Sequence, residues 1–245
     1  MKQCVRFAVV VSVMALSILA CQVGGLTSIR GSGNVAEETR EVGSFTGVAL
    51  AGIGELTIEV SEGESLRIEA EDNLMPYLEA EVRNGMLKIG VQDGVNLNPT
   101  RPVRFYLTVE ELDTIVLSGS GNIEAPDLGA ERFSVTISGS GDVEMGDLSA
   151  DTLDVVISGS GNLDIAGGRV EEQDITISGS GEYQAGDLSS ESVQITISGS
   201  GNATVWATES LDVRISGSGS VNYYGNPRTT FSGSGSGKLR SLGNP

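Results

Sequence analysis

The side chains of this sequence that could do chemistry are serines and carboxylates, because the chain has no histidine. Ser-His-Asp and Cys-His catalysis are therefore excluded, and the commonest transition-metal ligand is missing. The serines are concentrated in a tetrapeptide, Ser-Gly-Ser-Gly. It begins at Ser118, Ser138, Ser158, Ser178, Ser198, Ser216 and Ser232. An active site needs one special environment, so seven equivalent serines indicate a structural ladder. The sequence predicts no catalytic residue and no cofactor.

Acidic residues recur with the same period as the serines. One predicted outward column contains Glu124, Asp142, Glu144, Asp164 and Glu182, and a second set at a turn contains Asp127, Asp147 and Asp187. Stacked like charges repel each other, so either water and salt screen them or a divalent cation binds between them. No Gly-Gly-x-Gly-x-Asp calcium repeat is present. We therefore expect a solvated acidic face and assign no metal ligand, with weak Ca²⁺ binding as the alternative.

Three C-terminal side chains are candidate ligand contacts. Trp206, Tyr224 and Arg240 each follow the first serine of a repeat by eight residues. This spacing predicts that they stack in one outward column, where flat faces could bind a sugar ring. In the alternative interpretation, which we favour, the rings cover one another where the coil tapers.

The N-terminus resembles a bacterial export signal. Lys2 and Arg6 precede an apolar run from Phe7 to Ala20, which is too short to span a bilayer. The stretch Ile18-Leu19-Ala20-Cys21 resembles a lipobox, in which the cysteine is lipidated and becomes the new N-terminus. We therefore predict a signal peptide over 1–20, a membrane anchor at Cys21 and a short linker over 21–30. Gln22 after Cys21, in place of Asp, favours the outer membrane, and we predict a lipoprotein of the outer membrane or cell surface.

Charge and composition restrict the partners further. The formal net charge of −18 repels nucleic acid and anionic headgroups, so we expect neither as a partner. Cys4 lies in the predicted signal peptide, so the mature chain keeps no cysteine for a disulfide and depends on packing and backbone pairing. Apolar residues make up 39% of the chain and alternate regularly, which argues against disorder.

The repeat also predicts the fold, because its first five copies lie 20 residues apart. Apolar residues alternate with polar ones on both sides of each motif, as in a strand with one buried face. If this alternation continues through the motif, its glycines point inward at a corner and its serines point outward. The sequence thus predicts an all-β, single-domain, right-handed parallel β-helix (solenoid) with about 20-residue coils. Residues 118–245 would form the regular coils and a C-terminal cap, and 31–117 irregular first coils.

Other solenoids fit the sequence less well. A hexapeptide helix needs a multiple of six, and a leucine-rich repeat needs a helical return that is missing here. Pentapeptide repeats fit a period of 20, but that frame would turn Ile157 outward and give Gln173 a core position.

Three other segments resemble a known family. Gly-Ser-Gly-Asn at 31–34, the stretch 40–48 and Glu-Asp-Asn-Leu-Met-Pro-Tyr at 71–77 precede the Ser-Gly-Ser-Gly array. Together they resemble the bacterial head GIN domain family, described as auto-transporter adhesins. The resemblance covers nearly all of the mature chain. It implies a β-helical surface or envelope domain and supplies no catalytic or binding residues.

We expect a non-enzymatic, lipid-anchored envelope protein that contacts polysaccharide or another surface protein. The first alternative is a polysaccharide lyase or hydrolase, which needs carboxylates beside a basic group. Arg132, Arg169 and Arg214 occupy different predicted columns, which argues against that activity. The second alternative is a structural envelope component without a ligand. If the tail 238–245 does not cap the last coil, unpaired strands there could recruit a second copy and form a homo-oligomer.

Overall fold

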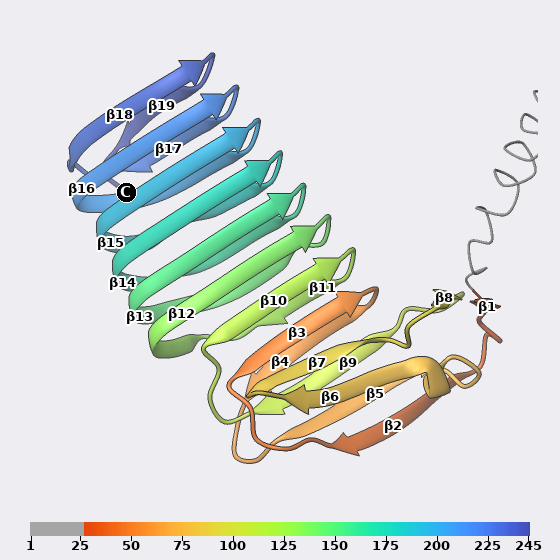
Figure 1. Cartoon of the computed structure of the whole chain (residues 1–245). Coiled ribbons are helices and arrows are strands. Elements are labelled where there is room, and N and C mark those ends of the chain that lie inside the picture. Colours follow the sequence, from red (N-terminus) through yellow and green to blue (C-terminus); the bar gives the residue numbers. More distant parts are fainter. Residues whose placement is uncertain (1–26) are drawn as a thin grey trace, which may run out of the picture.

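The structure, a computed structural model, describes residues 27–245 as a β-solenoid (Figure 1). The chain makes about six turns, with coils about 20 residues apart, and the single-domain, all-β prediction is confirmed. The predicted signal peptide and Cys21 lie outside the described residues. The last four residues of the predicted linker form a strand, β1 (Thr27–Arg30).

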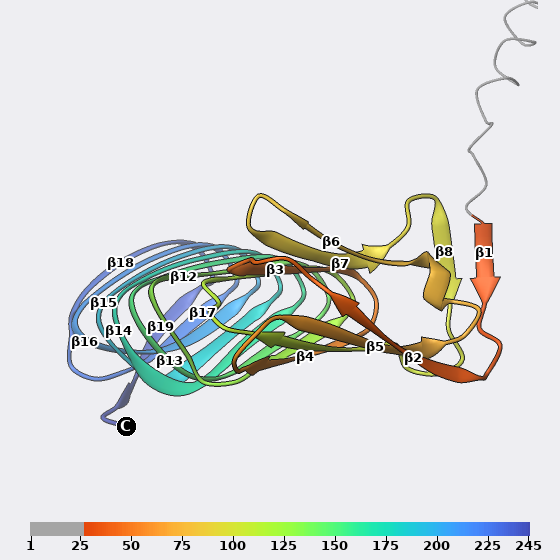
Figure 2. The ribbon, with the colours of Figure 1, turned by 90° about the horizontal axis from the view of Figure 1, so that it is seen from below.

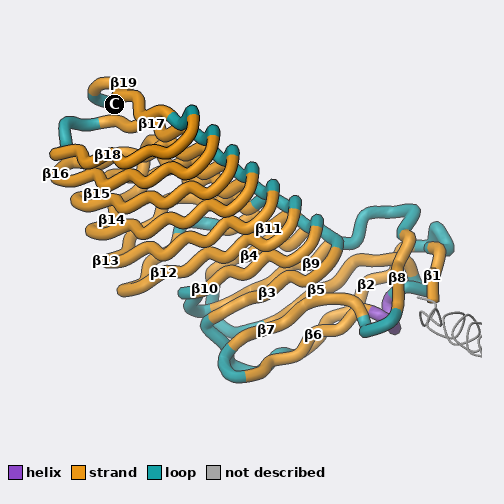
Figure 3. The backbone as a smooth tube through the Cα atoms, turned by 45° about the horizontal axis from the view of Figure 1, so that its top comes forward, coloured by secondary structure: helices purple, strands orange, loops and turns teal. Residues whose placement is uncertain are grey.

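Each central coil is one long strand. The strand follows one sheet, bends round the closed end of the flattened coil and returns along the other sheet (Figure 2). The turn predicted at Asp147 is therefore part of a bent strand and not a loop. Loops are confined to the opposite corner, where they form a line along the molecule (Figure 3). These strands are β13 (Val143–Gly159), β14 (Asn162–Gly179), β15 (Glu182–Gly199) and β16 (Asn202–Gly217).

Neighbouring coils pair in parallel and in register. Ile157 lies opposite Ile177, and Ile177 lies opposite Ile197. The solenoid starts with β10 (Thr114–Gly119), β11 (Asn122–Ala125) and β12 (Leu128–Gly139). It ends with β17 (Ser220–Tyr224), β18 (Arg228–Gly235) and β19 (Lys238–Gly243). The predicted C-terminal cap is thus strand β19, which pairs with β17 and leaves Leu242 38% exposed.

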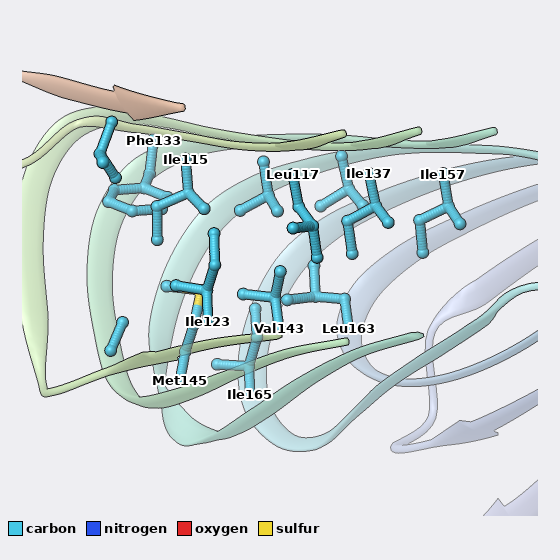
Figure 4. Close-up of a cluster of buried hydrophobic side chains, with 14 of the residues drawn as sticks. Ile115, Leu117, Ile123, Phe133, Ile137, Val143, Met145, Ile157, Leu163 and Ile165 are labelled. Carbon is cyan, nitrogen blue, oxygen red and sulfur yellow. The ribbon is translucent and has the colours of Figure 1, made fainter. Parts of the chain in front are cut away.

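The core consists of aliphatic side chains that face one another from the two sheets (Figure 4). Leu117 and Ile137 project from one sheet towards Ile123 and Val143 from the other, and all four are buried. Ile157 is fully buried, as the parallel β-helix predicts and the pentapeptide frame does not. Gln173 is buried as well, in the same inward column as Phe133 and Leu153.

The glycines of Ser-Gly-Ser-Gly allow successive coils to approach closely at the corner. The carbonyl of Gly179 accepts hydrogen bonds from the N–H groups of Ser200 and Gly201 in the next coil, at 2.8 and 3.0 Å. Gly199 has φ = 136°, which side chains rarely adopt. A Cβ on Gly201 would lie 2.5 Å from Cγ2 of Ile177. The first glycine of the motif, here Gly199, therefore adopts a backbone conformation that other residues rarely adopt. The second, here Gly201, leaves room for the side chain of Ile177 in the neighbouring coil.

The last repeat starts at Ser234, two residues after Ser232, where the sequence first shows the motif. Residues 232–237 read Ser-Gly-Ser-Gly-Ser-Gly, so two copies of the motif overlap. The structure pairs Ser216 with Ser234 and Gly217 with Gly235, and it therefore uses the second copy. The final step is 18 residues long, not the 16 residues that separate Ser216 from Ser232.

The N-terminal region is only partly a coil. β3 (Gly47–Gly52) and β4 (Glu55–Val60) pair in parallel with β10 and β11, as a first coil should. The remaining segments form a cap that combines parallel and antiparallel pairs, in place of the irregular first coils expected over 31–117. They are β2 (Val35–Glu41), β5 (Ser65–Glu71), the 3₁₀ helix η1 (Met75–Tyr77), β6 (Leu78–Arg83), β7 (Met86–Val91), β8 (Val95–Asn98) and β9 (Arg104–Val109).

A hairpin turn lies at Asn84-Gly85. β6 and β7 are antiparallel and joined by these two residues, both with positive φ (52° and 76°). That conformation is typical of a type I′ turn and matches the twist of the flanking strands.

A buried carboxylate, that of Glu71, holds the cap together. Glu71 is fully buried and accepts hydrogen bonds from the N–H of Gly33 (2.6 Å) and from the N–H and hydroxyl of Thr100 (2.8 and 2.6 Å). Burial raises the pKa of this carboxyl, but hydrogen bonds from Thr100, Gly33 and Arg101 outweigh that effect and lower the pKa. Next to it, the N–H of Ser32 donates to Asn73 Oδ1 at 2.8 Å. The segments 31–34 and 71–77, which carry the family resemblance, are therefore in direct contact.

The corner packing predicts that Gly201→Ala lowers the free energy of unfolding by about 1–3 kcal/mol, because the new methyl group overpacks the site. Gly129→Ala is the matched control, since a Cβ there would lie 3.7 Å from the nearest atom, the Ser149 carbonyl oxygen. We expect the control to change stability by less than about 0.5 kcal/mol. Urea denaturation followed by circular dichroism measures both, and equal effects would contradict the steric argument.

The hydrogen bonds to Glu71 predict a pH-dependent effect of Glu71→Gln. Because the folded pKa lies below the ordinary value of 4.5, the ionised carboxyl stabilises the fold at neutral pH. This contribution is lost as the pH falls below about 4.5 and through the folded pKa. Denaturation curves at pH 7, 5, 4 and 3 give the free energy of unfolding of the native chain and of the variant. The difference between the two free energies should become smaller as the pH falls. A difference of constant size would refute this role; Glu59→Gln, on the exposed surface, is the control.

Candidate functional site

The serines form two outward columns along the corner. From Ser138 onward both serines of every motif are exposed. In the last two coils hydroxyls bond to each other, at 3.1 Å between Ser218 and Ser236 and at 3.4 Å between Ser234 and Ser216. The first serines of successive motifs lie directly opposite one another from Ser138 to Ser216, so they form a ladder along the corner.

The predicted acidic column is two columns in the structure. Glu124, Glu144 and Asp164 lie opposite one another on successive coils. Glu182 instead lies opposite Asn162, which precedes Asp164 by two residues on the same strand. Asp142 lies in the column of Asn162 and Glu182. The single column expected from the sequence is therefore wrong, because residues two positions apart on one strand share a face but not a column.

Asparagine and aspartate in this second column form a hydrogen-bonded ladder that we did not predict. Oδ1 of Asn122 accepts the N–H of Asp142 at 3.2 Å, and Oδ1 of Asp142 accepts the N–H of Asn162 at 3.0 Å. Asn162 Oδ1 in turn accepts the N–H of Glu182 at 3.1 Å. The sequence signal was the polar residue that directly follows the Ser-Gly-Ser-Gly motif.

The acidic residues near this ladder do not gather into a metal site. Glu55, Glu124, Asp142 and Glu144 border a shallow hollow of about 230 Å³. Glu55 already pairs with Arg104 at 3.1 Å. Within residues 27–245, no group of three or more Asp, Glu or Cys side chains is arranged to hold a metal ion.

Two of the three candidate contact residues come together. Trp206 and Tyr224 lie opposite each other on β16 and β17, and both are half-buried. Arg240 lies opposite Asn222, so it is not in their column. This correction follows from the last repeat, because counting from Ser232 instead of Ser234 shifts Arg240 by two residues.

The two aromatic rings cover the place where the coil becomes shorter. The pairing of β15 with β16 shifts after Ala185, and Trp206 lies opposite Ser189. A Cβ on Gly186 would be 3.1 Å from the Tyr224 ring, so this ring lies over Gly186, in the coil of β15. The Tyr224 ring thus packs against the wall, and both rings still present part of their surface to solvent.

A buried polar cluster inside the solenoid was also missed. The Tyr183 hydroxyl donates to Gln173 Oε1 at 2.7 Å, and Gln173 Nε2 donates to the Ser190 hydroxyl. All three side chains are at most 2% exposed, and burial raises the pKa of Tyr183. Because each group is satisfied by another, the cluster replaces apolar packing without an unpaired buried polar group. Its role is structural.

The arginines of the regular coils are spread over the surface, as predicted. Arg132 pairs with Asp154 (3.1 Å), Arg169 with Glu191 (2.9 Å) and Arg214 with Asp212 (3.1 Å). The three lie in different columns, so they do not form one basic site. In the described residues, no helix is long and apolar enough to cross a membrane.

Comparison with known proteins gives one family and several similar structures. The family model described as "Putative auto-transporter adhesin, head GIN domain" matches residues 44–227. A putative adhesin from Bacteroides fragilis has a TM-score of 0.80 and 22% identity, covering 87% of this chain and all of that one. A putative lipid binding protein from Parabacteroides distasonis has a TM-score of 0.69 and 26% identity, covering 88% of this chain and all of that one.

A putative adhesin from Parabacteroides merdae has a TM-score of 0.69 and 21% identity, covering 88% of this chain and 99% of that one. At 21–22% identity the two adhesin structures show the shared fold alone. The comparison with curated proteins found no match.

Proposed function

Since this chain belongs to the head GIN domain family of putative auto-transporter adhesins, we propose that it is a non-enzymatic, adhesin-like protein of the cell envelope. Its solenoid wall contacts polysaccharide or another surface protein through many weak interactions. The single observation that carries this proposal is the wall itself, a rigid and regularly spaced array of exposed hydroxyls and carboxylates. Such an array suits repeated contacts along a ligand better than one reaction at one point.

The aromatic pair is the best candidate for a single strong contact. Trp206 and Tyr224 are half-buried, so packing fixes their rings while part of each ring stays accessible. A fixed aromatic face can stack on a sugar ring with little loss of side-chain entropy.

We also infer that the protein is an extracytoplasmic lipoprotein held in the membrane by lipid on Cys21. The lipobox-like sequence supports this anchor. β1, which is formed by the last four residues of the predicted linker, lies at the end of the molecule opposite β19 (Figure 1). An anchor at that end would let the regular coils project away from the membrane.

The contact proposal predicts that Trp206→Ala with Tyr224→Ala weakens binding to a glycan array about tenfold, because two stacking contacts are lost. Phe231→Ala is the matched control, since Phe231 is 45% exposed but lies outside the pair. Unchanged binding by the double variant would remove the aromatic pair from the proposal. Release of new reducing or unsaturated sugar ends during incubation would overturn the non-enzymatic proposal and favour a hydrolase or lyase.

The anchor proposal predicts that Cys21→Ser abolishes lipid attachment. In cells expressing the full chain, the native protein should partition into detergent and carry acyl chains detectable by mass spectrometry. The variant should lose both properties, since the thiol is the acylated group. Cys4→Ser is the control, because Cys4 lies in the segment that is removed. Acylation that persists in Cys21→Ser would refute the anchor.

A further inference from the structure

A polar groove runs along the solenoid axis on its outer surface. Its volume is about 450 Å³, and it crosses the coils from β12 to β16 at the start of one sheet. We call it the axial groove. Two columns of side chains form its sides. Thr152, Glu172 and Ser192 lie in one column, and Asp154, Asp174 and Gln194 in the other.

The axial groove presents polar side chains at a regular spacing along its length. Each coil adds one side chain to each column, at the strand spacing of about 4.8 Å. A ligand that lies along the axis therefore meets a pair of polar side chains at every coil. A linear polymer with a short repeating unit can use all of these positions, whereas a compact molecule can use only one or two.

The centre of the axial groove is negative and lacks a cation. At one end, Asp154 pairs with Arg132, and at the other end, Asp212 pairs with Arg214. Glu172 and Asp174, on the coil between them, form no ion pair with any described residue. Asp174 receives only a long hydrogen bond, 3.4 Å, from Gln194 Nε2. The central coil is thus suited to a positively charged group.

The sides of the groove offer side chains but little backbone. The backbone of these strands is engaged in pairing from coil to coil. An extended peptide in the groove would find few main-chain partners for its own N–H and C=O groups. A sugar chain has no such requirement, and its hydroxyls can bond to Ser192 and Gln194.

We propose that the axial groove binds a linear polysaccharide of amino sugars, with ammonium groups paired to Glu172 and Asp174. This inference rests on the proposed function, in which the wall contacts polysaccharide, and it names the site and the class of ligand. An anionic polysaccharide is repelled by the same carboxylates and by the net charge of −18.

The test uses glucosamine oligomers of two to eight units and isothermal titration calorimetry on the mature chain. We expect affinity to rise with oligomer length until the groove is filled and then to level off, and to fall as salt is added. Glu172→Gln with Asp174→Asn should bind the long oligomers about tenfold more weakly, because two ion pairs are lost. N-acetylated oligomers of equal length should bind weakly to both proteins, since they carry no ammonium group.

The matched control is Glu59→Gln with Glu62→Gln, which removes the same charge from exposed positions outside the groove. Equal weakening by both double variants would show attraction to the overall charge and overturn the site. Oligolysine that binds as tightly as glucosamine oligomers, with the same dependence on Glu172 and Asp174, would overturn the polysaccharide assignment. Thermal unfolding of each variant establishes that the solenoid is intact.

The aromatic variants separate this inference from the proposed function. If the native chain binds polysaccharide and only Trp206→Ala with Tyr224→Ala reduces that binding, the axial groove proposal fails and the proposed function stands. If the native chain binds no polysaccharide and no surface protein, both proposals fail.

Discussion

The close approach of backbone to backbone at the glycine corner is the constraint on which the rest of the structure depends. One carbonyl, such as that of Gly179, accepts two N–H groups from the next coil, and a side chain on Gly201 would have no room. This contact aligns each coil with its neighbour. The buried isoleucine columns, the asparagine ladder and the axial groove all follow from that alignment, because each needs equivalent residues to lie directly opposite one another.

The regular coils were predictable because their contacts repeat a local pattern: the 20-residue period and the alternation around Ile157 specify both register and inward face. The N-terminal cap was not, since the hydrogen bonds that Glu71 accepts from Gly33 and Thr100 join positions 38 and 29 residues apart that share no repeated motif. Counting eight residues from the first serine of each motif located the Trp206–Tyr224 pair but misplaced Arg240. The reason is that two overlapping copies of the motif near the C-terminus allow two starting points for the count. The axial groove depends on how the strand bends at the closed end, which alternation does not encode.

The proposed contact surfaces use the fold in two ways. The aromatic pair occurs where the repeat is broken, at the step where the coil shortens, and so provides one distinct position. The axial groove occurs where the repeat is intact and provides many similar positions. Weak interactions at many equally spaced positions add up along a polymer, while a single stacking contact can orient it.

The in-register pairing of β13, β14 and β15 has a consequence for how such a protein evolves. The two edges of each of these coils are nearly alike. Duplication of a gene segment that encodes 20 residues would therefore add one coil, which could pair with the original coil on one side and with the next coil on the other. The wall could then lengthen or shorten by whole units without redesign of either terminus. Variation in copy number among strains would change the reach of the molecule while leaving its local chemistry intact.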